Sequence, residues 1–83
     1  MLKGLENWIW TDHIEWQMWE RNISPQTILA VLNNPDEIIP GKKGRRIFQK
    51  LTKGKLVRVV VEDQTLITVY ITDKLEKYLR GHK

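Results

Sequence analysis

The sequence contains no cysteine and no long apolar run, and each absence excludes a class of protein. Without thiols the chain can form no disulfide framework, no thiolate zinc site and no cysteine nucleophile. No apolar stretch approaches the ~20 residues that span a bilayer, and no basic leader precedes an apolar segment. We therefore expect a cytoplasmic protein without a membrane partner. The length of 83 residues predicts one small domain, residues 1–83.

The charge is distributed unevenly between the two halves of the chain. Residues 1–40 contain two basic and six acidic residues, whereas residues 41–83 contain twelve basic and four acidic residues. The sequence pI is about 9.6. A basic half of this kind is a candidate surface for a polyanion such as RNA, although lysines also serve ordinary solubility.

Two helices are predicted in the first half, after the segment ENWIW (6–10), which is either a short edge strand or the lead-in to a helix. Asp12 is the expected N-cap of the first helix, which ends near Arg21. Asn22 suits the left-handed position that follows a helix. Ser24-Pro25 then predicts a second helix start, and Asn34-Pro35 ends that helix. The short link between the helices predicts a helical hairpin.

The second half changes to a period of two residues, which is typical of strands. Segments 45–51, 56–63 and 65–72 are rich in β-branched and aromatic residues, and the links between them force antiparallel neighbours. Segment 74–83 is a short C-terminal helix or a polar tail. The fold class is therefore α+β, with a helical hairpin packed on one face of a small antiparallel β-sheet and a short C-terminal helix.

Alternation along the strands predicts two different faces of this sheet. One face is aliphatic and is expected to pack on the helices; it contains Ile47, Leu51, Val57, Val59, Val61, Ile67, Val69 and Ile71. The opposite face contains Arg46, Phe48, Lys50, Leu56, Arg58, Val60, Glu62, Leu66, Thr68, Tyr70 and Thr72. Cations interleaved with aromatic rings are typical of surfaces that bind nucleic acid. The alternative is that the C-terminal helix or a second subunit covers this face.

The first predicted helix carries a polar stripe between two apolar borders. The stripe consists of His13, Gln17, Glu20 and Arg21, which are neighbours on one side of a helix. The borders are Ile14 and Met18 on one flank, and Trp16 and Trp19 on the other. This arrangement predicts a groove lined by the stripe. The alternative is that the stripe only makes hydrogen bonds within the protein.

A series of short motifs between residues 11 and 71 resembles a known family of small prokaryotic domains. The motifs are H-x-x-x-Q-M-x-x-R (13–21), N-I-S-P (22–25), L-N-N-P (32–35), G-R-R-I-F (44–48), L-V-R-V-V-V (56–61) and L-I-T-V-Y (66–70). That family is catalogued mainly as a domain of unknown function and has the pattern H…RM..RGIS…VL.NP…G…VVV…ITVY. It commonly has Arg where this chain has Gln17, and Gly where this chain has Asn22.

The order of elements in that family in turn resembles the RelE/ParE-like toxins of type II toxin–antitoxin systems, including the BrnT ribonuclease branch. The resemblance implies a basic sheet face that cuts RNA, in association with ribosomes or free, or that an antitoxin-like protein blocks. Fold analogy alone does not establish activity, because relatives with one fold differ in function.

The first functional hypothesis is a metal-independent endoribonuclease without a cofactor. The candidate catalytic residues are His13, Arg58 and Tyr70, which would supply a base, a cation and a proton donor. The candidate RNA-binding residues are Arg21, Arg46, Phe48 and Lys50. No tight cluster of metal ligands surrounds His13. The alternatives are a module that binds nucleic acid without cutting it, or a protein-interaction module, including a homodimer formed around Trp8.

Overall fold

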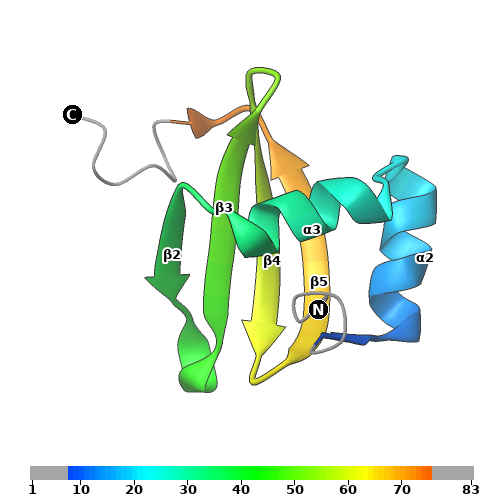
Figure 1. Ribbon diagram of the computed structural model, residues 1–83, viewed down its shortest axis with the longest axis vertical. Coiled ribbons are helices and arrows are strands. Elements are labelled where there is room, and N and C mark those ends of the chain that lie inside the picture. Colours follow the sequence, from blue (N-terminus) through cyan, green and yellow to red (C-terminus); the bar gives the residue numbers. More distant parts are fainter. Residues whose placement is uncertain (1–7, 76–83) are drawn as a thin grey trace.

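The computed structural model describes residues 8–75. Its elements in chain order are β1 (Ile9–Trp10), α2 (Asp12–Arg21), α3 (Pro25–Asn33), β2 (Glu37–Pro40), the 3-10 turn η1 (Lys42–Gly44), β3 (Arg46–Thr52), β4 (Lys55–Glu62) and β5 (Thr65–Thr72). The strands form one sheet; α3 crosses one of its faces and α2 lies beside β5 (Figure 1). The predicted C-terminal helix falls almost entirely outside the described residues.

The sheet is mixed, with the strand order β1-β5-β4-β3-β2. Strands β2 to β5 form an antiparallel meander, and β1 adds a parallel pairing at the edge of β5. The β3–β4 turn consists of Lys53 and Gly54, which both have positive φ. Two left-handed residues give a tight turn whose twist matches that of the flanking strands. The predicted order of helices followed by an antiparallel meander is confirmed.

The N-cap of α2 lies one residue earlier than predicted. Thr11 is the N-cap, and its hydroxyl accepts a hydrogen bond from the Ile14 amide at 3.1 Å. The same hydroxyl donates a hydrogen bond to the Leu66 carbonyl of β5. A threonine hydroxyl can both accept from the helix and donate to the sheet, whereas the carboxylate of an aspartate can only accept. Asp12 is instead the first helical residue, where its charge favours the helix N-terminus. The predicted left-handed Asn22 is confirmed, with φ 58° and ψ 47°.

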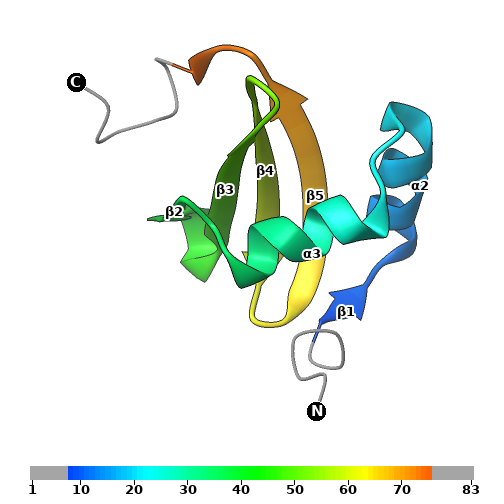
Figure 2. The same ribbon diagram turned by 45° about the horizontal axis from the view of Figure 1, so that its top comes forward.

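α3 begins and ends where its sequence predicted. Ser24 caps the first turn by accepting a hydrogen bond from the Thr27 amide, and Pro25 occupies the first helical position. Its buried side chains are Ile28, Val31 and Leu32. α3 packs over β3 and β4, and Figure 2 shows it lying across the strands. We call this side of the sheet the α3 face and the opposite side the far face.

The hydrophobic core lies between the helices and the α3 face. It consists of Ile14, Met18, Ile23, Ile28, Val31, Leu32, Phe48, Val57, Val59, Val61, Leu66 and Val69. Three of the four valines of β4, namely Val57, Val59 and Val61, are on the predicted face. β3 has the opposite orientation from the predicted one: Phe48 is 5 % exposed in the core, opposite Val59. Arg46 and Lys50 share its face by alternation, whereas Ile47 and Leu51 lie on the far face.

Two local features of the sheet differ from the sequence prediction. Residues 37–40, which lie outside the predicted helices and strands, form the edge strand β2, which pairs with β3 from Glu37 to Pro40. In β5 the register shifts opposite Val60 and Val61, so Leu66 pairs with Val61 and enters the core. The shift displaces Ile67 from the predicted aliphatic face, because a bulge inserts one residue into the alternation.

Candidate functional site

The predicted site residues lie in three separate places. Arg58 and Tyr70 meet on the far face of the sheet. Arg46, Phe48 and Lys50 lie on the α3 face, because β3 has the opposite orientation from the predicted one. His13 and Arg21 lie on α2, beside the β5 edge. The predicted basic face is therefore not one surface, because its cations are divided between the two faces and the edge.

A polar row crosses four adjacent strands on the far face. The Arg58 Nη1 donates to the Tyr70 hydroxyl at 2.5 Å, and its Nε donates to the Gln49 Oε1 at 2.9 Å. The Gln49 Nε2 in turn donates to the Glu37 Oε1 at 2.7 Å. The pairing of β2 to β5 places these residues directly opposite one another. We call Glu37, Gln49, Arg58 and Tyr70 the cross-strand row.

Burial along the cross-strand row is greatest in its middle. Gln49 is fully buried and Arg58 is only 6 % exposed, whereas Glu37 and Tyr70 are half-buried at the two ends. A buried guanidinium is tolerated when its donors are hydrogen-bonded, and the row satisfies this condition. The Arg58 Cζ also lies 5.4 Å from the centre of the Tyr70 ring. Arg58 thus contacts both the hydroxyl and the ring of Tyr70. Tyr70 is the more solvent-exposed member of this pair.

Two members of the cross-strand row were not predicted as site residues. Gln49 alternates with Phe48 and Lys50, so the wrong orientation of β3 placed it toward the helices. Glu37 lies outside the helices and strands that the sequence predicted. The available signal was the apolar pair Ile38-Ile39 directly after Glu37, which is typical of a short strand.

Arg46 and Phe48 belong to an aromatic cluster under α3. The Arg46 Cζ lies 5.1 Å from the centre of the Phe48 ring. Trp8 meets the same ring edge-on, with centroids 5.9 Å apart and an interplanar angle of 85°. Phe48 is buried, so its ring faces are occupied by protein, whereas the Arg46 side chain is exposed. Of these residues, Arg46 is the one accessible to a phosphate.

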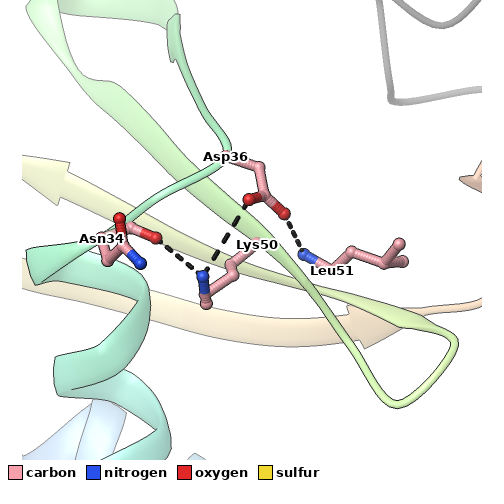
Figure 3. Close-up of polar contacts among 4 residues, drawn as sticks. All are labelled: Asn34, Asp36, Lys50 and Leu51. Carbon is pink, nitrogen blue, oxygen red and sulfur yellow. Dashed lines mark hydrogen bonds and ion pairs between the residues drawn. The ribbon is translucent and has the colours of Figure 1, made fainter.

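Lys50 ties the end of α3 to β3. Its Nζ donates to the Asn34 carbonyl at 2.9 Å and lies 4.0 Å from the Asp36 Oδ1 (Figure 3). The second oxygen of Asp36 accepts a hydrogen bond from the Leu51 amide at 2.7 Å. A cation at the C-terminus of a helix is favoured by the helix dipole. These contacts account for Lys50 as a structural residue within the fold.

The polar stripe of α2 covers the edge of β5. The Gln17 Oε1 accepts hydrogen bonds from the Val69 amide at 3.0 Å and from the Thr68 hydroxyl at 2.5 Å. The Arg21 Nη1 donates to the Val69 carbonyl at 3.4 Å. Both backbone groups of Val69 are thus paired by side chains in place of a neighbouring strand. Because a bare strand edge invites association, this part of the stripe has a structural function.

His13 lies on the flank of α2 that turns toward the far face. Ile14 and Met18 point to the core on the α3 side, and Gln17 points to the β5 edge. Continuing around the helix in the same direction brings His13 to the far-face side. Its side chain is exposed, and it makes no hydrogen bond or ion pair with other residues of segment 8–75. His13 therefore borders the surface on which Tyr70 lies.

A cationic loop joins β2 to β3. Lys42 and Lys43 are exposed and have no carboxylate partner within residues 8–75. Arg45 forms an ion pair with Glu62 at 3.0 Å, and Arg46 contacts the Asp63 carbonyl at 3.5 Å. We call Lys42, Lys43, Arg45 and Arg46 the cationic loop. It is the densest group of positive charge in the described segment.

The described segment has further concave regions, one of which lies at β2 and is lined by Glu37, Ile38, Ile39 and Pro40. A pocket of about 330 Å³ on the α3 face is lined by Asn22, Ile23, Thr27, Thr52, Lys53, Lys55, Val57 and Ile71. It contains none of the predicted site residues. Between residues 8 and 75 no group of three His, Asp or Glu side chains is placed to hold a metal ion. No helix in that range is long and apolar enough to cross a membrane.

The comparison with protein families identifies the chain. The family described as Domain of unknown function (DUF4258) matches residues 10–71. No curated protein and no solved structure matches the chain. The matched residues run from β1 into β5 and so include α2, the cross-strand row and the cationic loop. Because the match covers most of its length, the chain belongs to the DUF4258 family.

Proposed function

We propose that this chain is an RNA-binding protein of the RelE/BrnT-like toxin type, which cleaves RNA without a metal ion on the far face of its sheet. The observation that carries the proposal is the cross-strand row, in which a buried guanidinium holds the hydroxyl of Tyr70 at a surface bordered by His13. The Arg58 guanidinium both lies against the Tyr70 ring and donates to its hydroxyl, and a proton donor held in one position suits acid–base chemistry.

The reaction would be the attack of a ribose 2′-oxygen on its own phosphorus. His13 would accept the proton of the 2′-hydroxyl, and Tyr70 would give its phenolic proton to the departing 5′-oxygen. The products are a 2′,3′-cyclic phosphate and a free 5′-hydroxyl, so atoms and charge balance. The Tyr70 oxygen already accepts a hydrogen bond from Arg58, which leaves its own O–H free to donate. The guanidinium would stabilise the phenolate left behind.

The spacing across the sheet excludes Glu37 as a base that acts together with Tyr70. Glu37 and Tyr70 are separated by three strand intervals of about 4.8 Å each, or roughly 14 Å. That separation is too large for both to act on one phosphodiester. Glu37 therefore serves to orient Gln49, and through it Arg58. α2 lies directly beside β5, the strand that carries Tyr70, and His13 on this helix is the candidate base.

RNA cleavage by the purified protein tests this proposal. We expect cleavage to persist in EDTA and to leave 2′,3′-cyclic phosphate ends. Tyr70→Phe keeps the ring and removes only the hydroxyl, and we expect it to lower the cleavage rate by about a hundredfold or more. His13→Ala should lower the rate by a similar factor, because it removes the proposed base. His13 is exposed, so this substitution should leave the fold intact. Thr72→Val is the matched control, since it removes another hydroxyl from the far face of β5.

The folded state of each variant is checked by thermal unfolding, so that lost activity is not confused with lost structure. Cleavage that is undiminished in both Tyr70→Phe and His13→Ala would contradict the assignment. Loss of activity in Thr72→Val to the same degree would contradict it as well. Arg58→Lys keeps the charge but not the two-pronged contact with Gln49 and Tyr70, and is expected to be impaired.

A second candidate function is RNA binding without cleavage, and the cationic loop favours it. Lys42 and Lys43 are free of carboxylates within the described segment and can contact phosphates. Each phosphate contact contributes about 0.7 to the slope of log affinity against log salt for a single strand. Lys42→Ala/Lys43→Ala should therefore reduce that slope by roughly 1.4. Salt-dependent RNA binding with no cleavage by the unaltered protein would select this function.

The toxin-like proposal also implies the cell context. RNA as the substrate, free or on ribosomes, places the activity in the cytoplasm. A cognate antitoxin-like protein is the expected partner of a chain of this type. Controlled expression in a bacterial host should arrest growth, and Tyr70→Phe should relieve that arrest. Growth that is equally arrested by both forms would separate toxicity from the proposed chemistry.

A further inference from the structure

Two neighbouring tryptophans are exposed on the outward side of α2. Trp16 is 55 % exposed and Trp19 is 81 % exposed. They are three residues apart, so their indoles lie next to each other on the helix surface. In Figures 1 and 2, α2 stands at the side of the sheet, and its outer flank meets no other labelled element. The packing of residues 8–75 therefore leaves a large apolar surface uncovered at this place.

Carboxylates surround these indoles. Around the helix, Asp12 falls between the two tryptophans, Glu15 lies beyond Trp19 and Glu20 lies beyond Trp16. None of these three carboxylates has an ion-pair partner in the described residues. The nearby cation Arg21 points to the Val69 carbonyl at the β5 edge. We call Asp12, Glu15, Trp16, Trp19 and Glu20 the outer α2 face.

The other side of the helix is firmly attached. Ile14 and Met18 are buried in the core, and Gln17 and Thr11 are hydrogen-bonded to β5. These contacts fix how α2 is rotated, so the two tryptophans cannot turn inward without breaking them. A rigid, already exposed pair of indoles loses little conformational freedom when a partner binds.

The charges on this face decide the class of partner. Three uncompensated carboxylates repel phosphate groups, so an RNA strand or an anionic membrane is disfavoured in spite of the stacking surface that indoles provide. Lysine and arginine are attracted both by the carboxylates and by the indole faces. Tryptophans are also enriched among the residues that dominate protein interfaces.

We propose that the outer α2 face is a docking site for a basic amphipathic segment of a partner protein, in which lysine or arginine alternates with aliphatic side chains. The aliphatic groups cover Trp16 and Trp19, and the cations pair with the carboxylates at the rim. The centre of this site, at Trp16 and Trp19, lies on the opposite flank of α2 from the β5 edge, and Glu20 stands at the rim between the indoles and the polar stripe. The two indoles take no part in the proposed RNA cleavage.

A designed helical peptide containing only leucine and lysine serves as the probe, and its leucine and glutamate counterpart is the negative control. Calorimetric titration of the full chain measures the affinity. We expect the lysine peptide to bind and to shift tryptophan fluorescence to the blue. Trp16→Ala/Trp19→Ala should weaken binding by at least about thirtyfold, which corresponds to one hot-spot residue. Ile38→Ala, at another exposed apolar residue, should have no effect.

A charge exchange gives the sharpest test. Glu15→Lys/Glu20→Lys should abolish binding of the lysine peptide and create binding of the glutamate peptide. Asp73→Lys, at an exposed acidic residue outside this face, should leave both affinities unchanged. Equal binding of both peptides to the unaltered chain would overturn the proposal. So would weaker RNA binding in the tryptophan variant, or a dimer of the chain that the tryptophan variant converts to a monomer.

Discussion

Gln17 connects α2 to the edge of β5, and its replacement by methionine gives a quantitative test of that connection. Gln17 is 9 % exposed, and its Oε1 accepts hydrogen bonds from the Val69 amide and the Thr68 hydroxyl. Methionine has a similar length, an unbranched chain and a similar helix propensity, but offers no comparable acceptor. The substitution therefore removes the two hydrogen bonds with little change in packed volume.

The expected cost follows from the groups left without a partner. An unpaired buried amide costs about 1–3 kcal/mol, and the loss of the Thr68 contact adds about 1 kcal/mol at most. The total is about 1–4 kcal/mol. Its middle value, about 2.5 kcal/mol, should lower the melting temperature of a domain of this size by roughly 10–20 °C. The urea midpoint should fall with an unchanged slope, since the surface exposed on unfolding remains the same.

Thermal and urea unfolding, followed by circular dichroism, measure this effect. Gln26→Met is the matched control, because Gln26 is exposed in the first turn of α3. Hydrogen exchange of the Val69 amide provides a local readout and should become faster only in Gln17→Met. If Gln17→Met and Gln26→Met were equally stable, Gln17 would not protect the β5 edge and the reasoning would be refuted.

Two further predictions concern stability. Asn22→Ala should destabilise the protein by about 1–2 kcal/mol and Asn22→Gly should not, because Asn22 has a left-handed backbone conformation. That conformation is unfavourable for a residue with a Cβ unless a short polar side chain such as that of asparagine can hydrogen-bond locally, and glycine has no Cβ. Urea unfolding compares the two variants, and equal stability would contradict the geometry. Glu62→Gln should change the free energy of unfolding by less than about 1 kcal/mol, since the Arg45–Glu62 pair is exposed to solvent. A larger loss, or one that salt does not reduce, would show that this pair matters more than a surface ion pair.

Gln17 stands at a position where the family pattern commonly has Arg, and the two side chains cannot make the same contacts with β5. An arginine side chain has hydrogen-bond donors but no acceptor, so it cannot accept the hydrogen bond that the Val69 amide donates to Gln17. The polar stripe therefore has two parts. Gln17 and Arg21 close the sheet edge, while His13 is exposed on the flank that borders the far face.

The sequence alone determined the features that depend on local chemistry. Asn22, Ser24 and Pro25 marked helix boundaries correctly because caps act on backbone groups within one turn. Val57, Val59 and Val61 identified the buried face of β4 because the alternate positions include the charged residues Arg58 and Glu62. The grouping of two helices before an antiparallel meander followed from the helix caps in the first half of the sequence and from the two-residue period of the second half.

The tertiary structure decided those features for which the local sequence allows two conformations or orientations about equally well. β3 has bulky side chains at both sets of alternate positions, so only its pairing with β4 decides that Phe48 faces the core. β2 is too short to be recognised without its partner strand, and it supplies Glu37 to the cross-strand row. The row itself joins residues from four strands, whose alignment depends on long-range pairing. Sequence periodicity carries no information about that alignment, because any register preserves the alternation within a strand.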